Sequence, residues 1–108
     1  MRVLFVCGRN RRRSPTAEQH FAAWPGIETA SAGLSPDADI ALTPDLIEWA
    51  ELICVMEPAQ RRKLSQRFGP QLKGRRLACL GIPDNYAFMD PVLIRRLEST
   101  VPGLLRTR

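Results

Sequence analysis

Two residues near the N-terminus have the types and spacing for covalent phosphate chemistry: Cys7 and, after five intervening residues, Arg13. The apolar run Val3–Val6 precedes them, and Ser14 and Pro15 follow as the predicted cap and first residue of a helix. Backbone N–H groups that lead into a helix N-terminus bind anions, and a guanidinium can donate two parallel hydrogen bonds to phosphate oxygens. The loop from Cys7 to Arg13 is therefore predicted to hold a phosphate.

Cys7 is the predicted nucleophile of this loop. A thiol at a helix N-terminus among arginines is expected to exist largely as the thiolate, which is the nucleophilic form. The Ser14 hydroxyl could donate to this sulfur and stabilise the thiolate as a leaving group. Cys54 and Cys79 lie within apolar segments, where packing roles are expected. With three cysteines and no Cys-x-x-Cys pair, we expect no disulfide framework, no metal site and no cofactor.

The composition indicates one folded domain over residues 1–108, with 44% apolar residues and a net charge of +5. The apolar runs are too short to cross a membrane and no signal peptide is evident, so a cytoplasmic location is expected. The arginines near the N-terminus would also suit nucleic acid, but no aromatic residues alternate with them, so nucleic acid is not the expected partner. The basic segment 61–76 is interpreted as a solvated surface.

Strand and helix signals alternate along the chain. Strands are predicted near residues 3–6, 27–31, 52–56 and 76–80, and helices from Ser14 to Trp24 and from Pro44, Pro58 and Pro91 onward. This alternation is typical of an α/β domain with a four-stranded parallel sheet and helices on both faces. Ligands of such sheets bind beyond the carboxyl ends of the strands, and Cys7 lies at the first such end.

The loop resembles the phosphate-binding signature of the low-molecular-weight protein tyrosine phosphatases, with Cys7, Asn10, Arg13, Ser14 and Pro15 matching in place. Three further motifs resemble that family in the same order over nearly the whole chain. They are Ser31-Ala32-Gly33, the segment Ala50–Glu57 and the pair Asp90-Pro91. The chain is thus similar to short bacterial members of the family.

The resemblance implies that Cys7 forms a phosphocysteine, that Arg13 binds the phosphate and that Asp90 acts as the general acid and then the general base. Asp84 is the reserve candidate for that acid. The implied substrate is a phosphomonoester, above all phosphotyrosine in a protein, or a small aryl phosphate. The remaining loop and support residues are expected to bind the phosphate or hold the loop: Gly8, Arg9, Asn10, Arg11, Arg12, Ser14 and Ser31.

Asn10 is expected to adopt a left-handed backbone conformation, which asparagine tolerates better than most residues, with Ser31 hydrogen-bonding toward it. Asp90 could also cap the helix that Pro91 opens, a role compatible with that of the acid. His20, on the inner side of the first helix, is interpreted as a packed or capping residue and not as a catalytic base.

Several positions depart from the family pattern. Arg12 replaces a second cysteine, Arg9 replaces a glycine, and Arg11 is neither the aliphatic residue of the tyrosine phosphatases nor the threonine of the arginine phosphatases. The segment between Gly33 and Thr43, which helps to wall the substrate slot, is short. Val92 and Leu93 stand where the family has aromatic residues, so we expect Tyr86 and Phe88 to stack on a substrate ring instead.

These departures leave the substrate open, together with the oligomeric state and the pathway. Phosphoarginine hydrolysis and arsenate reduction are alternative activities, although arsenate reduction needs relay cysteines in a mobile segment. A phosphate or nucleic-acid binding module without catalysis is the alternative from another functional class, and its binding would depend strongly on salt.

Overall fold

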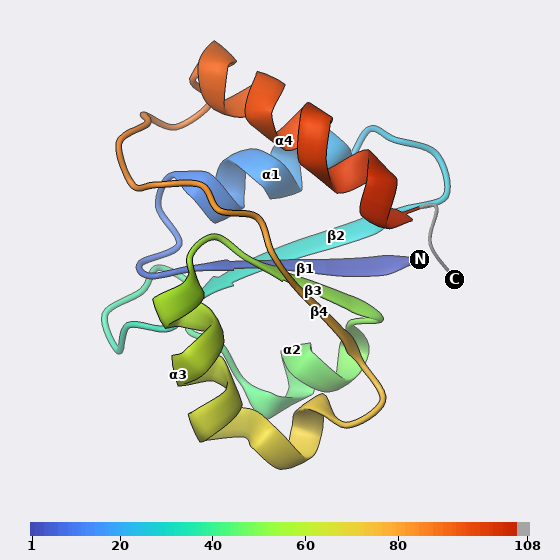
Figure 1. The fold of residues 1–108 in the computed structure, drawn as a ribbon, viewed down its shortest axis with the longest axis vertical. Coiled ribbons are helices and arrows are strands. Elements are labelled where there is room, and N and C mark those ends of the chain that lie inside the picture. Colours follow the sequence, from blue (N-terminus) through green and yellow to red (C-terminus); the bar gives the residue numbers. More distant parts are fainter. Residues whose placement is uncertain (106–108) are drawn as a thin grey trace.

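A four-stranded parallel sheet forms the centre of the protein in the computed structural model, which describes residues 1–105 (Figure 1). The strand order is β2-β1-β3-β4. The strands are β1 (Arg2–Cys7), β2 (Glu28–Gly33), β3 (Leu52–Val55) and β4 (Arg76–Cys79). The predicted fold class is confirmed; residues 106–108 of the predicted domain lie outside the described residues.

Helices cover both faces of the sheet, α1 and α4 on one side and α2 and α3 on the other (Figure 1). Their bounds are α1 (Arg13–Phe21), α2 (Pro44–Trp49), α3 (Pro58–Phe68) and α4 (Pro91–Leu105), with a short 3₁₀ helix η1 (Gly69–Leu72) after α3. No helix in residues 1–105 is long and apolar enough to cross a membrane.

The central strand β1 positions the phosphate loop. Its residues Val3–Cys7 are all buried, because the strand pairs with β2 and β3 and helices cover both of its faces. Val3 and Phe5 pack toward α1 and α4, and Leu4 and Val6 pack toward α2 and α3. Parallel pairing brings the carboxyl ends of β1, β2 and β3 to one edge, where the loop begins.

The start of α1 differs from the prediction. Arg12, not Ser14, occupies the N-cap position, and no side chain caps this end. The Ser14 hydroxyl instead contacts the sulfur of Cys7. The helix ends at Phe21 and does not reach Trp24, whose ring packs edge-on against Phe21 with centroids 4.9 Å apart. The N-terminus of α1 is thus left open toward the loop.

The other helices begin at the prolines that the sequence indicates. Thr43 caps α2 by accepting a hydrogen bond from the backbone N–H of Leu46. Glu57 and Gln60 form a capping box at the start of α3. Strand β2 begins one residue later and ends two residues later than predicted, and β3 and β4 each end one residue earlier.

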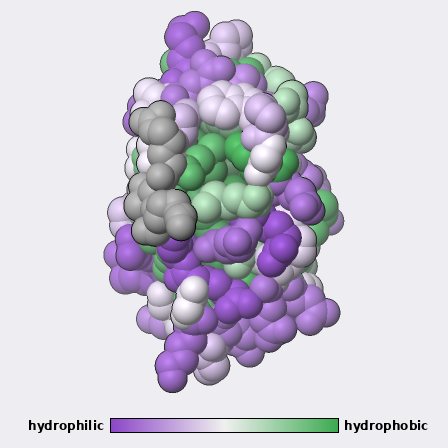
Figure 2. All heavy atoms as spheres, turned by 90° about the vertical axis from the view of Figure 1, so that its right-hand side faces the viewer, coloured by the Kyte–Doolittle hydropathy of each residue, from purple (hydrophilic) through white to green (hydrophobic). Residues whose placement is uncertain are grey.

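The edge of the sheet opposite the phosphate loop carries an apolar surface. Figure 2 shows this face, where hydrophobic residues gather in the centre and hydrophilic residues surround them. The hollow in this area has a volume of about 300 Å³ and is lined by the following residues: Met1, Trp24, Pro25, Gly26, Ile27, Pro102 and Leu105.

Candidate active site

The backbone of the phosphate loop is held from outside by the segment after β2. The carbonyl oxygens of Cys7, Gly8 and Arg9 accept hydrogen bonds from the N–H groups of Leu34, Ser35 and Asp39, at 3.0, 2.8 and 3.1 Å. The described peptide bonds are trans, so each N–H points away from the carbonyl of its own peptide. The N–H groups that follow these carbonyls therefore face the interior of the loop, where they can bind an anion.

Gly33 permits this close approach between the two segments. A Cβ atom at Gly33 would lie 2.6 Å from the Gly8 oxygen and 2.6 Å from the Ala38 Cβ, which is shorter than side chains tolerate. The glycine of the predicted Ser31-Ala32-Gly33 motif is therefore required by packing against the loop.

The sulfur of Cys7 lies at the base of the loop, where the residue is only 3% exposed. The Asn10 N–H donates to it at 3.2 Å, and the Ser14 Oγ lies 2.9 Å away. Ser14 Oγ also accepts a hydrogen bond from Asn10 Nδ2 at 2.9 Å, which leaves the hydroxyl proton free to point at the sulfur. Both contacts favour a negatively charged sulfur.

Asn10 joins the loop to the neighbouring strand. Its φ is 59°, in the left-handed region that the sequence analysis expects. Its Nδ2 donates to Ser31 Oγ at 2.9 Å, and Ser31 Oγ donates to Glu18 Oε1 at 2.5 Å. Glu18 is a support residue that the sequence analysis missed; its position one turn after Ser14 on α1 was the available signal.

Arg13 is 4% exposed and is held by segments that follow β3 and β4. Its Nη1 donates to the Ile82 carbonyl at 2.8 Å and lies 3.0 Å from Glu57 Oε1, and its Nε lies 3.7 Å from Asp84 Oδ1. Glu57 was not predicted as a site residue. These partners fix the direction of the guanidinium at the edge of the loop.

A cavity of about 510 Å³ lies at the phosphate loop. Asn10, Ser14 and Ser31 lie below it, buried in the loop's support. The lining residues come from the phosphate loop, the segment after β2, the start of α3 and the segment after β4: Cys7, Gly8, Arg9, Arg11, Arg12, Arg13, Ser35, Glu57, Gln60 and Asp84.

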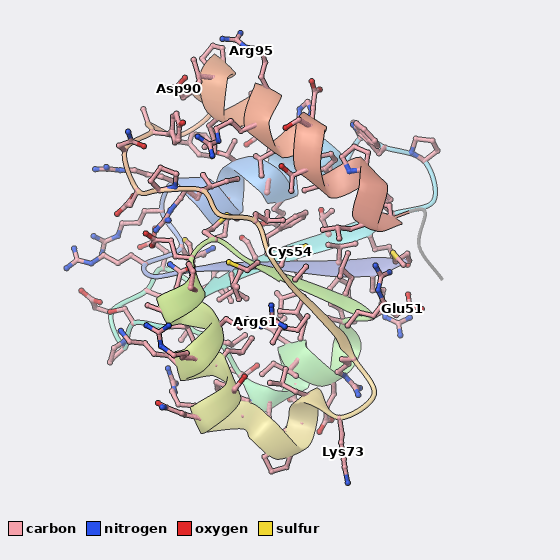
Figure 3. The ribbon with its side chains drawn as sticks, in the orientation of Figure 1. Glu51, Cys54, Arg61, Lys73, Asp90 and Arg95 are labelled. Carbon is pink, nitrogen blue, oxygen red and sulfur yellow. The ribbon has the colours of Figure 1, made fainter. Side chains whose placement is uncertain are left out.

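The structure places Asp84, and not Asp90, at this cavity. Asp84 lines it with a side chain that is 60% exposed. Asp90 lies at the start of α4, where its Oδ1 accepts a hydrogen bond from the Val92 N–H at 2.8 Å (Figure 3). Asp90 therefore acts as a helix cap. The preference for Asp90 in the sequence analysis followed from the resemblance of Asp90-Pro91 to the family's late Asp-Pro pair.

The two aromatic residues expected to face the substrate lie elsewhere. Tyr86 packs against the core between the sheet, α1 and α4, and its hydroxyl accepts a hydrogen bond from Arg96 at 3.3 Å. Phe88 is 48% exposed and does not line the cavity. His20 packs against the Phe21 ring and lies 2.7 Å from Glu98 on α4, away from the cavity.

The remaining cysteines lie apart from the cavity. Cys54 is buried in β3 (Figure 3), and the loss of solvent raises the pKa of its thiol to about 12. Cys79 is half-buried in β4. Among residues 1–105, no group of three His, Cys, Asp or Glu side chains is arranged to hold a metal ion.

No protein-family model matches this sequence, and no curated protein matches it. Solved structures of phosphatases do share its fold. The tyrosine phosphatase AmsI from Erwinia amylovora is 25% identical with a TM-score of 0.70, covering 94% of this chain and 91% of its own. The tyrosine phosphatase Wzb from Escherichia coli K30, in complex with phosphate, is 23% identical with a TM-score of 0.75, covering 95% and 94%.

A third similar structure belongs to a phosphatase that acts on a different residue. The arginine phosphatase YwlE from Geobacillus stearothermophilus is 22% identical with a TM-score of 0.69, covering 99% of this chain and 97% of its own. The chain thus has the fold of the low-molecular-weight tyrosine phosphatases over nearly its whole length, as the sequence resemblance indicates.

Proposed function

We propose that this chain is a cysteine-dependent phosphatase that hydrolyses phosphomonoesters through a phosphocysteine intermediate, with protein phosphotyrosine as the leading substrate. The observation that carries the proposal is the base of the loop. There the Cys7 sulfur has two hydrogen-bonding partners, Asn10 N–H and Ser14 Oγ, below a cavity that Arg13 borders. The shared fold with tyrosine phosphatases supports it.

In the first step the Cys7 thiolate attacks phosphorus, the S–P bond forms and the P–O ester bond breaks. Inward N–H groups and the Arg13 guanidinium stabilise the charge on the phosphoryl oxygens. Asp84, protonated, gives its proton to the leaving oxygen.

In the second step the Asp84 carboxylate accepts a proton from water, which attacks phosphorus and breaks the S–P bond. The electron pair returns to sulfur, where the Ser14 hydroxyl and the Asn10 N–H stabilise the thiolate. We prefer Asp84 to Asp90 in both steps because Asp84 lines the cavity and Asp90 does not.

The test is hydrolysis of an aryl phosphate, p-nitrophenyl phosphate, in the presence of EDTA. We expect turnover by the wild-type protein and none by Cys7→Ser, because a serine hydroxyl is a far weaker nucleophile at neutral pH. Cys79→Ala is the matched control, since it removes a cysteine that does not line the cavity. Full activity of Cys7→Ser would refute the mechanism.

Phosphoarginine hydrolysis is the second candidate, because one similar structure is an arginine phosphatase. Turnover on matched phosphotyrosine, phosphoserine and phosphoarginine peptides at fixed salt separates the substrates. Arsenate reduction is less favoured than either activity, since the relay cysteines it needs are not at the cavity: Cys54 and Cys79 lie in strands. A thiol-coupled arsenate assay tests it.

A binding module without catalysis would instead bind nucleic acid in a salt-dependent way that survives Cys7→Ser.

We propose a phosphorylated protein as the partner, no metal or cofactor, a cytoplasmic location and a single domain over residues 1–108. Fractionation of the native cells tests the location.

A further inference from the structure

The mouth of the cavity carries more positive charge than one phosphate binding site needs. Four guanidinium groups line the cavity together with only two carboxylates, those of Glu57 and Asp84. Both carboxylates lie against the buried Arg13, at 3.0 and 3.7 Å. They are therefore committed to the arginine that borders the loop and do not neutralise the outer arginines.

One of the three outer arginines has an acidic partner of its own. Arg11 Nε lies 3.2 Å from Asp39 Oδ1, and its Nη2 donates to the Asp37 carbonyl at 3.5 Å. These contacts turn Arg11 toward the segment after β2. Arg11 thus contributes to the wall of the cavity.

The other two, Arg9 and Arg12, are exposed at the mouth. Within residues 1–105, neither guanidinium lies within 4.0 Å of a carboxylate. The Asp37 carboxylate accepts a hydrogen bond from Ser35, which together with the charge of Arg9 lowers its pKa, but it lies beyond 4.0 Å from the Arg9 guanidinium. Arg9 and Arg12 are therefore available to an external anion.

No aromatic or large aliphatic side chain lines the cavity in the described part of the chain. Tyr86 packs against the core and Phe88 lies outside, so a substrate ring would contact mainly guanidinium planes and the stem of Gln60. Apolar contact therefore discriminates little between substrates here, and charge is the remaining source of selectivity.

Resting on the proposed phosphatase function, we infer that the preferred substrate carries a second anionic group beside the scissile phosphate, and that Arg9 and Arg12 bind it. The group is a carboxylate or a second phosphate, both of which a guanidinium binds through paired hydrogen bonds. The two arginines flank the cavity mouth, whereas the inward N–H groups and Arg13 hold the scissile phosphate.

The experiment compares kcat/KM for phosphotyrosine peptides of equal length whose neighbouring residues are alanine, aspartate or phosphoserine. For the wild-type protein we expect a preference of about fivefold for the anionic peptides over the alanine peptide, the size expected from two exposed ion pairs. The preference should fall with rising salt. The aspartate and phosphoserine arms distinguish the two sources of the second charge.

In R9Q/R12Q the ratio between anionic and alanine peptides should fall to about one. The control R62Q/R95Q removes the same charge from arginines of α3 and α4 that do not line the cavity, and it should keep the ratio. Arg95 points away from the body of the protein at the start of α4 (Figure 3).

Equal kcat/KM on all peptides in the wild-type protein overturns the inference, as does a preference that persists in R9Q/R12Q or disappears in R62Q/R95Q. Hydrolysis of p-nitrophenyl phosphate in the same preparations shows whether the proposed function itself holds. If turnover is absent, the affinities of Cys7→Ser for the same peptides still decide the inference, since binding does not require the thiol.

Discussion

The floor and the rim of the phosphate loop differ in how firmly the fold holds them. The floor residues are no more than 4% exposed, and hydrogen bonds or ion pairs link their side chains to neighbouring elements. The rim arginines are exposed, and neither Arg9 nor Arg12 has a carboxylate within 4.0 Å among the described residues. The floor residues are Cys7, Asn10, Arg13, Ser14 and Ser31.

Because of this difference, we expect the floor to carry the chemistry and the rim to carry the selectivity among substrates. A reacting sulfur and its stabilising donors must keep fixed positions, and buried hydrogen-bonded groups do so because breaking one leaves an unsatisfied polar atom. Exposed arginines adapt to different ligands at little structural cost. Substitutions on the floor should therefore affect the rate on every substrate, whereas rim substitutions should affect the choice among substrates.

The largest expected effect separates the two aspartates that follow β4. Asp84→Asn should lower kcat on a substrate with a poor leaving group by about 10²–10⁴-fold, because the general acid is lost. Asp90→Ala should leave kcat within about twofold and lower the free energy of unfolding by about 0.5–2 kcal/mol, as loss of a helix cap does. Steady-state kinetics measure kcat for both variants, and thermal unfolding measures their stability.

The reverse result, a large loss of kcat in Asp90→Ala with little change in Asp84→Asn, would restore Asp90 as the acid. A p-nitrophenol leaving group needs less protonation than a tyrosine does, so the effect of Asp84→Asn should be smaller on p-nitrophenyl phosphate. That dependence on the leaving group separates an acid from a merely structural carboxylate.

Arg13→Lys tests the floor next. Lysine keeps the charge but not the planar pair of donors, so we expect kcat/KM to fall by about 10²–10³-fold on every phosphate ester. Arg12→Lys is the matched control on the adjacent rim position and should stay within about threefold. Equal losses in the two variants would remove the distinction between floor and rim.

A smaller effect is expected at Asn10, where two roles can be separated. Asn10→Gly keeps the left-handed backbone and loses the bonds to Ser14 and Ser31, whereas Asn10→Ala also strains the backbone. Both variants should lower kcat by about tenfold, because Ser14 loses the hydrogen bond from Asn10. Only the alanine variant should lose a further ~1 kcal/mol of unfolding free energy in chemical denaturation. Equal stability of the two variants would argue against backbone strain.

The smallest effect should come from Arg11→Gln. Its exposed contact with Asp39 is worth about 0.2–1 kcal/mol, so the unfolding temperature should change by only a few degrees. We expect kcat on p-nitrophenyl phosphate to change less than threefold. A loss comparable to that of Arg13→Lys would place Arg11 with the floor.

The parts of the fold that local sequence signals govern could be predicted. A continuous apolar run indicated β1, and Thr43, Pro44, Pro58 and Pro91 indicated the helix starts, because capping and proline geometry act within a few residues. The exception is Ser14, whose type suits an N-cap but whose hydroxyl is turned to the Cys7 sulfur. Two local roles were open to one residue, and the hydrogen bond from Asn10, which Ser31 of β2 holds in place, selected between them.

For the candidate site, the sequence by itself determined the loop: the spacing of Cys7 and Arg13 and the left-handed Asn10 are properties of a few consecutive residues. Only the tertiary structure decided which carboxylate faces the cavity, that Glu18 supports Ser31 and that Glu57 holds Arg13. The physical reason is distance along the chain. These contacts join residues from different strands and helices, and parallel pairing of β1, β2, β3 and β4 alone brings them to one edge of the sheet.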